Sequence, residues 1–273
     1  MNGREIIAAL HAGRRVYSSA IVATSPLWPN LAKQAGIDFV FVDTEHTPVD
    51  RETLSWTCQT YNALGLPPVV RLPCNDPFEA CKVLDAGAGG VIGPYLETAE
   101  QARDLAGAVK FRPLKGRRLQ EALRDPNSLE PELREYLEKR NGDKILIAQI
   151  ESVPALENLH AICSVPGVDA VLIGPHDLSC SLGIPEQYTH PRFDDSVRSI
   201  FRIAREHGVG AGIHYWLDVD QEVTWSKAGG NLVMHSSDLA TFSRTLKKEI
   251  GELRTRLEEE SRPKRPQHLL DLP

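Results

Sequence analysis

Two carboxylates stand at matching places in the sequence, each at the end of an apolar run. The first run ends in Gln149-Ile150-Glu151 and the second in Gly174-Pro175-His176-Asp177, with an amphipathic segment between them. This pattern predicts a strand–helix–strand unit whose parallel strands end at the same edge of a sheet. Because carboxylate oxygens suit Mg²⁺ and Mn²⁺, Glu151 and Asp177 predict a cation site completed by water or a chelating substrate. For either residue alone, a helix cap or a surface ion pair is the alternative.

A candidate anion-binding residue and a candidate general base lie at the ends of two other apolar runs. Arg71 is suited to hold a carboxylate or an oxyanion with two N–H groups, although a structural salt bridge would also use it. His46, in the segment Asp43-Thr44-Glu45-His46, is a candidate general base because an imidazole titrates near neutral pH. Asp43 or Asp85 would orient it, unless Asp43 instead caps the following segment.

Two further histidines, His214 and His235, end the last two apolar runs. We interpret them as polar lining of the same region rather than as catalysts. No lysine ends any of these runs, and a Schiff-base enzyme needs one, so imine chemistry is not predicted.

These residues need a scaffold that brings the ends of many strands together. Eight apolar, β-rich runs alternate with helical stretches, and no change in composition divides residues 1–250 into two domains. Such alternation predicts a (β/α)8 TIM barrel, whose functional side chains gather at the carboxyl ends of the strands. A doubly wound sheet competes less well, because no Gly-rich loop follows the first run. The predicted strands are Val16–Val22, Ile37–Asp43, Pro68–Leu72, Gly89–Tyr95, Ile145–Glu151, Val168–Gly174, Val209–Tyr215 and Asn231–Ser237.

Two segments depart from this rhythm. Residues 112–143 are charged, contain three prolines and include a predicted polar helix over Pro131–Arg140, as in a lid or an interface element. Residues 251–273 form a charged extension with a Pro-rich end, for which we expect packing against a neighbouring subunit or disorder.

Composition limits the possible partners. The 273 residues carry a net charge of −6 with scattered basic residues, which gives no reason to expect nucleic acid. The five cysteines form no CxxC pair and indicate free thiols in a reducing compartment. No signal peptide or membrane span is indicated, so we expect a cytoplasmic protein without a membrane partner.

Several motifs together resemble a known family. The stretches GIDFVFVDTEH, PPVVRLPCNDP, AQIESVPALENL and GVDAVLIGPHDLSCSLGIP occur in the order typical of the HpcH/HpaI aldolase/citrate lyase family, whose metal-dependent (class II) pyruvate aldolases include 4-hydroxy-2-oxoheptanedioate aldolase. The resemblance covers roughly residues 10–250. It implies a (β/α)8 barrel and a homohexamer, a trimer of dimers, that exchanges a C-terminal helix over residues 238–250.

The resemblance also implies roles for individual residues. Glu151 and Asp177 would bind the divalent metal. Mg²⁺ or Mn²⁺ is favoured, and Co²⁺ or Zn²⁺ is the alternative. Arg71 would stabilise the enolate, and His46 would be the general base, tuned by Asp43 and Asp85. The residues implied to contact the 2-oxo acid are Gln149, Gly174, Pro175, His176 and Arg118, the last of which matches a motif arginine.

The implied reaction is cleavage or formation of the C3–C4 bond of a 4-hydroxy-2-oxo acid, giving pyruvate and an aldehyde. Alternatives are oxaloacetate decarboxylation and a malyl- or citryl-type CoA lyase, although the scattered charges do not suggest a channel for CoA. A non-catalytic barrel that binds a 2-oxo acid is a further alternative, which the complete set of polar residues disfavours.

Four positions around the predicted pocket depart from the family pattern. Ala20 stands where a tryptophan is usual, Gly93 replaces a bulkier apolar residue, and Leu119 replaces a glycine next to Arg118. The strand end around His214 is also unusual. We therefore predict that the metal and base set is retained and that the electrophile differs.

Overall fold

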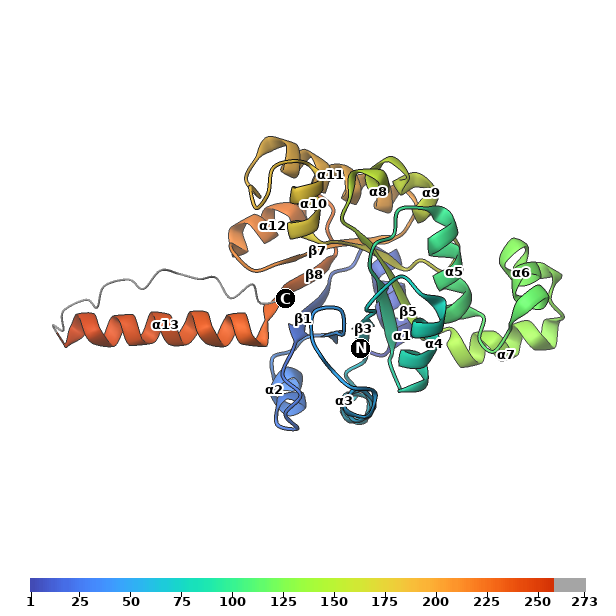
Figure 1. The fold of residues 1–273 in the computed structure, drawn as a ribbon, viewed down its shortest axis with the longest axis horizontal. Coiled ribbons are helices and arrows are strands. Elements are labelled where there is room, and N and C mark those ends of the chain that lie inside the picture. Colours follow the sequence, from blue (N-terminus) through green and yellow to red (C-terminus); the bar gives the residue numbers. More distant parts are fainter. Residues whose placement is uncertain (258–273) are drawn as a thin grey trace.

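The computed structural model describes residues 1–257, which form a closed barrel of eight parallel strands (Figure 1). The strands follow one another around the barrel in sequence order, and β8 pairs with β1 to close it. All eight predicted strands are confirmed, with shorter ends, and so is the (β/α)8 architecture. The strands are β1 (Val16–Ile21), β2 (Phe39–Asp43), β3 (Pro68–Arg71), β4 (Gly90–Gly93), β5 (Ile145–Ile150), β6 (Ala170–Ile173), β7 (Gly210–Tyr215) and β8 (Leu232–Ser237).

The apolar strands are buried on both faces, which explains why their sequences are continuous rather than alternating. On β2, Phe39 and Phe41 belong to the core inside the barrel, whereas Val42 packs in a second core between the strands and the outer helices. Side chains two residues apart share a face of a strand, so Asp43 points inward above Phe41. By the same alternation Arg71 lies above Val69, and Asp43 and Arg71 are register partners.

Helices cover the outside and the bottom of the barrel. Ile6 and Leu10 of the first helix, α1, join the interior core and close the N-terminal end. Asp76 is the N-cap of α4, and its side chain accepts a hydrogen bond from the amide of Phe78. The segment between β5 and β6 forms two short helices rather than one. The helices here are α1 (Gly3–His11), α2 (Trp28–Gln34), α3 (Arg51–Ala63), α4 (Pro77–Asp85), α5 (Ala99–Lys110), α8 (Val153–Glu157), α9 (Leu159–Cys163), α10 (Pro175–Ser181), α11 (Pro191–Glu206) and α12 (Val219–Lys227).

The segment 112–143 lies at the N-terminal end of the barrel. It joins the end of α5 to the start of β5 and folds as α6 (Gly116–Arg124), a short 3₁₀ helix η1 (Pro126–Ser128) and α7 (Pro131–Asn141). The predicted helix at Pro131 is confirmed as α7, but α6 was not predicted. Its amphipathic pattern is short, and the small separate core that buries Ala122 against Leu129 and Leu137 comes from the rest of the segment. Because helices of a (β/α)8 barrel end below the strands, this segment cannot cover its own mouth.

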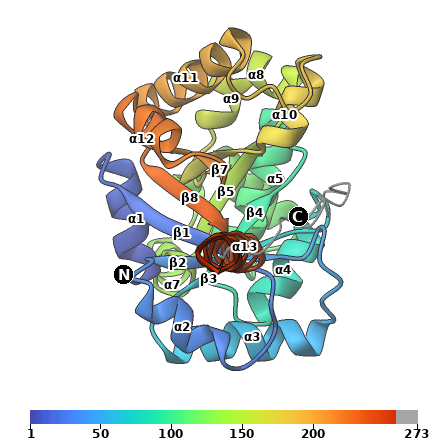
Figure 2. The same cartoon turned by 90° about the vertical axis from the view of Figure 1, so that its left-hand side faces the viewer.

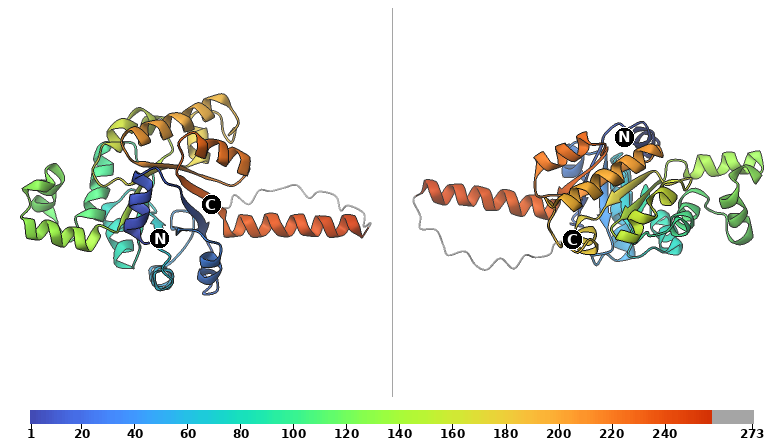
Figure 3. Two further views of the ribbon diagram at one scale, coloured as in Figure 1. Left: turned by 180° about the vertical axis from the view of Figure 1, so that it is seen from behind. Right: turned by 90° about the horizontal axis from the view of Figure 1, so that it is seen from above.

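The last helix, α13 (Asp238–Arg256), follows β8 directly and projects from the mouth. Figure 2 views this end with α13 toward the reader, and Figure 3 shows α13 and the α6–α7 segment on opposite sides of the barrel. No helix within residues 1–257 combines the length and apolarity that a membrane span requires. The predicted extension 251–273 begins inside α13, and its residues 258–273 lie outside the described part. Phe242, Leu246, Ile250, Leu253 and Leu257 form an exposed apolar stripe at helical spacing on α13.

Candidate active site

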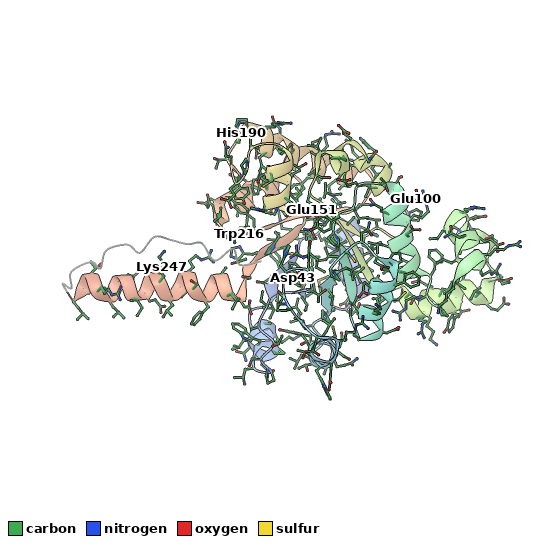
Figure 4. The ribbon with its side chains drawn as sticks, in the orientation of Figure 1. Asp43, Glu100, Glu151, His190, Trp216 and Lys247 are labelled. Atoms are coloured by element: carbon green, nitrogen blue, oxygen red, sulfur yellow. The ribbon has the colours of Figure 1, made fainter. Side chains whose placement is uncertain are left out.

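The inward side chains of the strands change from apolar to polar at the mouth of the barrel. β2 and β3 end in Asp43 and Arg71, and β5 leads into Gln149 and Glu151. All four side chains are buried, and Figure 4 labels Asp43 and Glu151 in the middle of the molecule. Buried polar groups require partners, so the contacts among these residues define the site.

Arg71 is the central cation of this cluster. Its Nε and Nη2 donate to the two oxygens of Asp43 at 2.8 and 2.7 Å, and its Nε lies 3.1 Å from Oε2 of Glu45. Burial alone would raise the pKa of Asp43, but the hydrogen bonds and charge of Arg71 outweigh it and lower that pKa. Nη1 donates to no protein group in the described part of the chain, so it is available to a substrate oxygen.

Asp43 therefore serves Arg71 more directly than His46. Asp43 also accepts a hydrogen bond from the backbone N–H of Glu45. Within residues 1–257 it forms no hydrogen bond with His46. The His46 side chain is half exposed, and its Nε2 lies 3.8 Å from Oε2 of Glu45. The hydrogen bond from the Glu45 amide to Asp43 is a local turn, because the next helix, α3, is capped by Asp50, and the carboxylate beside His46 is Glu45.

Glu45 and Tyr95 were missed in the sequence. The Glu45 side chain is 8% exposed, and its Oε2 has no hydrogen-bond partner among the described residues. The nearby carboxylate of Glu45 is the largest cause that raises the pKa of Tyr95 to about 12. Tyr95 also donates its backbone N–H to Oε1 of Glu151 at 2.8 Å, with a left-handed φ of 54°. Tyr95, which follows β4, is therefore close to both carboxylates.

Glu151 is the buried carboxylate of β5. Its Oε2 accepts a 2.6 Å hydrogen bond from Nε2 of Gln149. Burial raises the pKa of Glu151 to about 7, and the negative charges of Asp177 and Glu45 add to the rise, while the Tyr95 amide opposes it. Gly174 leaves room beside it, because a Cβ there would lie 2.6 Å from Oε2 of Glu151 and 2.9 Å from Nε2 of Gln149 and would displace these side-chain ends.

The donor set fits a hard divalent cation. Asp177 is exposed in the first turn of α10, and its charge acts on Glu151. Oε1 of Gln149 is buried and has no hydrogen-bond partner in the described chain. Two carboxylates that repel each other beside an unsatisfied oxygen suit Mg²⁺ or Mn²⁺. No group of three or more His, Cys, Asp or Glu side chains in residues 1–257 could hold a metal, so substrate or water would have to supply the other ligands.

The remaining predicted substrate contacts divide between the two ends of the barrel. Gly174 caps α10, and Pro175 and His176 begin that helix at the mouth; the His176 side chain is exposed, with Nδ1 3.6 Å from Glu186. Arg118 instead lies on α6, where it pairs with Glu121 and Glu130.

Asp85, like Arg118, lies away from the mouth of its own barrel. It is the last residue of α4, which ends at the N-terminal side of the barrel. Its side chain is 72% exposed and forms an ion pair with Arg112 at 2.9 Å. Neither Asp85 nor Arg118 therefore lies at the mouth of its own barrel. Asp85 is the last residue of α4 and Arg118 lies in α6, which follows the end of α5, and the helices of a barrel end at the opposite side from the ends of its strands.

The last two histidines face different environments. His214 points inward on β7, where its Nε2 lies 3.0 Å from the carbonyl oxygen of Ser236. His235 is paired through Nδ1 with the two oxygens of Glu222 on α12, at 2.8 and 3.0 Å. Only His214 belongs to the inner wall of the mouth.

A parallel eight-stranded barrel with paired carboxylates, an arginine and a histidine at the carboxyl ends of its strands is an enzyme scaffold. The sequence profile of the HpcH/HpaI aldolase/citrate lyase family matches residues 22–245. The chain belongs to this family and is accordingly a carbon–carbon lyase.

Individual relatives agree with this membership. The chain is 29% identical to 5-keto-4-deoxy-D-glucarate aldolase of Klebsiella pneumoniae subsp. pneumoniae, over 86% of this chain and 91% of that protein. It is 32% identical to 4-hydroxy-2-oxo-heptane-1,7-dioate aldolase of Shigella sonnei, over 76% and 78% of the two chains. The crystal structure of an HpcH/HpaI aldolase from Desulfitobacterium hafniense DCB-2 superposes with a TM-score of 0.78 at 27% identity, covering 90% of this chain and 95% of that one.

The raised pKa of Glu151 predicts how the stability of the metal-free protein depends on pH. The folded chain holds this proton up to about pH 7, whereas the unfolded chain releases it near 4.5. The stabilisation is therefore complete below pH 4.5 and is lost as pH rises to 7. Relative to Glu151→Gln, the wild type should lose on the order of 3 kcal/mol of unfolding free energy across this window.

Urea unfolding at pH 5 and pH 7.5 in EDTA measures this difference. Adding Mn²⁺ at pH 7.5 should restore stability to the wild type more than to the variant, because the cation replaces the proton on Glu151. If the unfolding free energies of the wild type and Glu151→Gln change equally with pH in EDTA, the burial of this carboxylate is contradicted.

Proposed function

We propose that the protein is a divalent-metal-dependent aldolase that cleaves or forms the C3–C4 bond of a 4-hydroxy-2-oxo acid through the enolate of pyruvate. The observation that carries the proposal is the burial of Glu151 at the mouth of the barrel, where the charges of Asp177 and Arg71 act on its carboxylate. The printed names of the two aldolase relatives support aldol chemistry, and the metal and the substrate are part of the proposal.

Glu151 and Asp177 would hold Mg²⁺ or Mn²⁺, with Co²⁺ or Zn²⁺ as other fits. When bound, such a cation supplies Lewis acidity that stabilises negative charge on the 2-oxo acid. Gln149 and the start of α10, from Gly174 to His176, would orient the carboxylate and the 2-oxo group. Gln149 is held for this purpose by its hydrogen bond to Glu151.

Arg71 would stabilise the oxygen on which charge develops. Its Nε and Nη2 are fixed by Asp43, so the guanidinium is oriented before the substrate arrives and its free Nη1 can donate to the oxyanion. Such preorganised donors lower the barrier most in a site that excludes water. Phe41 packs on the guanidinium, with Cζ 5.4 Å from the ring centroid, and shields it on one side.

His46 would accept the proton of the C4 hydroxyl group in the cleavage direction. The C3–C4 bond then breaks, the aldehyde leaves, and the enolate takes up a proton to give pyruvate. His46 suits this role because its side chain is half exposed and lines a cavity of about 510 Å³ between α3 and α4, through which solvent reaches it. Glu45 stands beside His46 to stabilise the imidazolium that forms.

We also propose a homo-oligomer, a hexamer built as a trimer of dimers, in which α13 is exchanged between subunits. The exposed apolar stripe on α13 supports this assembly. Asp85 and Arg118 lie at the far end of their own barrel. The roles that the resemblance assigns to them can be filled only at the mouth of a neighbouring copy.

The reaction is tested by metal-dependent release of pyruvate from a panel of 4-hydroxy-2-oxo acids. Glu151→Ala should abolish turnover and metal binding, because Asp177 alone cannot hold the cation. Arg71→Lys should lower kcat about a hundredfold by losing the oriented guanidinium donor. Glu100→Ala, an exposed carboxylate on α5, is the control and should keep full activity. Turnover of Glu151→Ala at the wild-type rate, or wild-type activity that survives EDTA, would refute the metal-dependent mechanism.

The assembly is tested by co-expressing two inactive variants, His46→Ala and Asp85→Ala, with separate tags. If Asp85 acts on the His46 of a neighbour, random mixing should restore about one quarter of the sites. Mass photometry of the wild type should show six copies. A monomeric mass, or no activity in the mixed oligomer, would contradict the shared site.

A further inference from the structure

His214 is held in one tautomer by a distortion of the neighbouring strand. Pairing of β8 with β1 shifts register between Ser18 and Ala20, and Ser236 adopts a left-handed φ of 55°. The Ser236 carbonyl oxygen lies 3.0 Å from Nε2 of His214. A carbonyl can only accept a hydrogen bond, so Nε2 carries the hydrogen and Nδ1 keeps its lone pair.

Aromatic rings fix the imidazole at the wall of the mouth. The Phe41 ring meets it edge to face at a centroid distance of 5.5 Å, and Trp216 lies 5.8 Å away. Phe41 is the same ring that packs on Arg71, so one side chain separates His214 from the guanidinium. Its register partner on β1 is Ala20, which presents only a methyl group.

The imidazole is therefore an acceptor rather than a base. Burial lowers the pKa of His214 to about 4, so the ring is neutral at physiological pH and binds a proton too weakly for general base catalysis. Nδ1 accepts a hydrogen bond from no group in the described part of the protein. A ligand hydroxyl would satisfy this nitrogen, whereas a carboxylate or carbonyl oxygen placed there would be repelled.

We infer that His214 selects the electrophile: it accepts, at Nδ1, a hydrogen bond from a hydroxyl group on the carbon next to the aldehyde. The preferred aldehyde is then a 2-hydroxyaldehyde, whose hydroxyl becomes the C5 hydroxyl of the aldol. β7 is the next strand after β6, which leads to Gly174 and Asp177, and His214 reaches across the barrel toward Phe41 and Arg71. The group beyond the bond-forming carbon would meet this wall. This inference rests on the proposed aldolase function.

The test compares two aldehydes of equal size, glycolaldehyde and propanal, condensed with pyruvate by the Mn²⁺-loaded enzyme. The wild type should prefer glycolaldehyde in kcat/KM, and His214→Leu should reduce that preference about tenfold by removing the acceptor. His214→Asn should restore much of it, because its side-chain oxygen stands near the position of Nδ1. His235→Leu is the matched control on β8 and should leave the preference unchanged.

Deuterium exchange into the pyruvate methyl group, measured without aldehyde, separates this inference from the proposed function. Exchange should be unchanged in His214→Leu, because His214 does not act on pyruvate. If the wild type exchanges deuterium but shows no preference for glycolaldehyde, or if His214→Leu slows both aldehydes equally, the selective role is wrong and the aldolase proposal stands. If the wild type neither exchanges nor condenses, the proposed function fails and the inference fails with it.

Discussion

Three carboxylates with little exposure surround a single guanidinium at the mouth of this barrel. The pKa of Arg71 is raised by the negative charges of Asp43, Glu45 and Glu151. Of these three carboxylates, only Asp43 forms a bidentate pair with the guanidinium. Negative charge that is removed from water must be paired or neutralised by a proton. Asp43 is paired and stays ionised, whereas Glu151 receives too little compensation and holds its proton up to about pH 7. The buried carboxylates of the site thus carry more negative charge than Arg71 neutralises. A divalent cation beside Glu151 and Asp177 would supply the missing positive charge.

The strand register of the barrel determines where these charged side chains lie. The last inward positions of β2 and β3 are register partners, so Asp43 and Arg71 meet without any loop having to position them. On the other side Gly174 leaves room for Glu151 and Gln149, and the left-handed backbone of Tyr95 directs an amide at Glu151. A rigid wall of this kind keeps the charged groups in place before a substrate binds, which is what catalysis by electrostatic preorganisation requires. The electrophile would meet a different wall, built from His214, Phe41 and Trp216.

Much of this arrangement could be predicted from the sequence, because buried parallel strands are continuous apolar runs and their ends mark the mouth. That reasoning located all eight strands and brought Arg71, Glu151 and Gly174 to one end of the fold. It missed Glu45 and Tyr95, whose roles depend on contacts between the segments that follow β2, β4 and β5, and no local pattern records such contacts. Asp85 and Arg118 lie at the far end of their own barrel, and their predicted roles leave open which copy supplies them, because a resemblance between sequences does not say so. α6 was missed because its helix depends on a small core formed by its own segment.

The central claim is that Glu151 and Asp177 hold a divalent cation that a 2-oxo acid completes. Its most direct test is the anomalous diffraction of Mn²⁺ in crystals soaked with Mn²⁺ and pyruvate. One strong peak is expected at the mouth, where the carboxylates of Glu151 and Asp177 and two oxygens of pyruvate would bind the Mn²⁺. Pyruvate bound at the mouth without a Mn²⁺ peak, or a peak bound by other side chains, would contradict it.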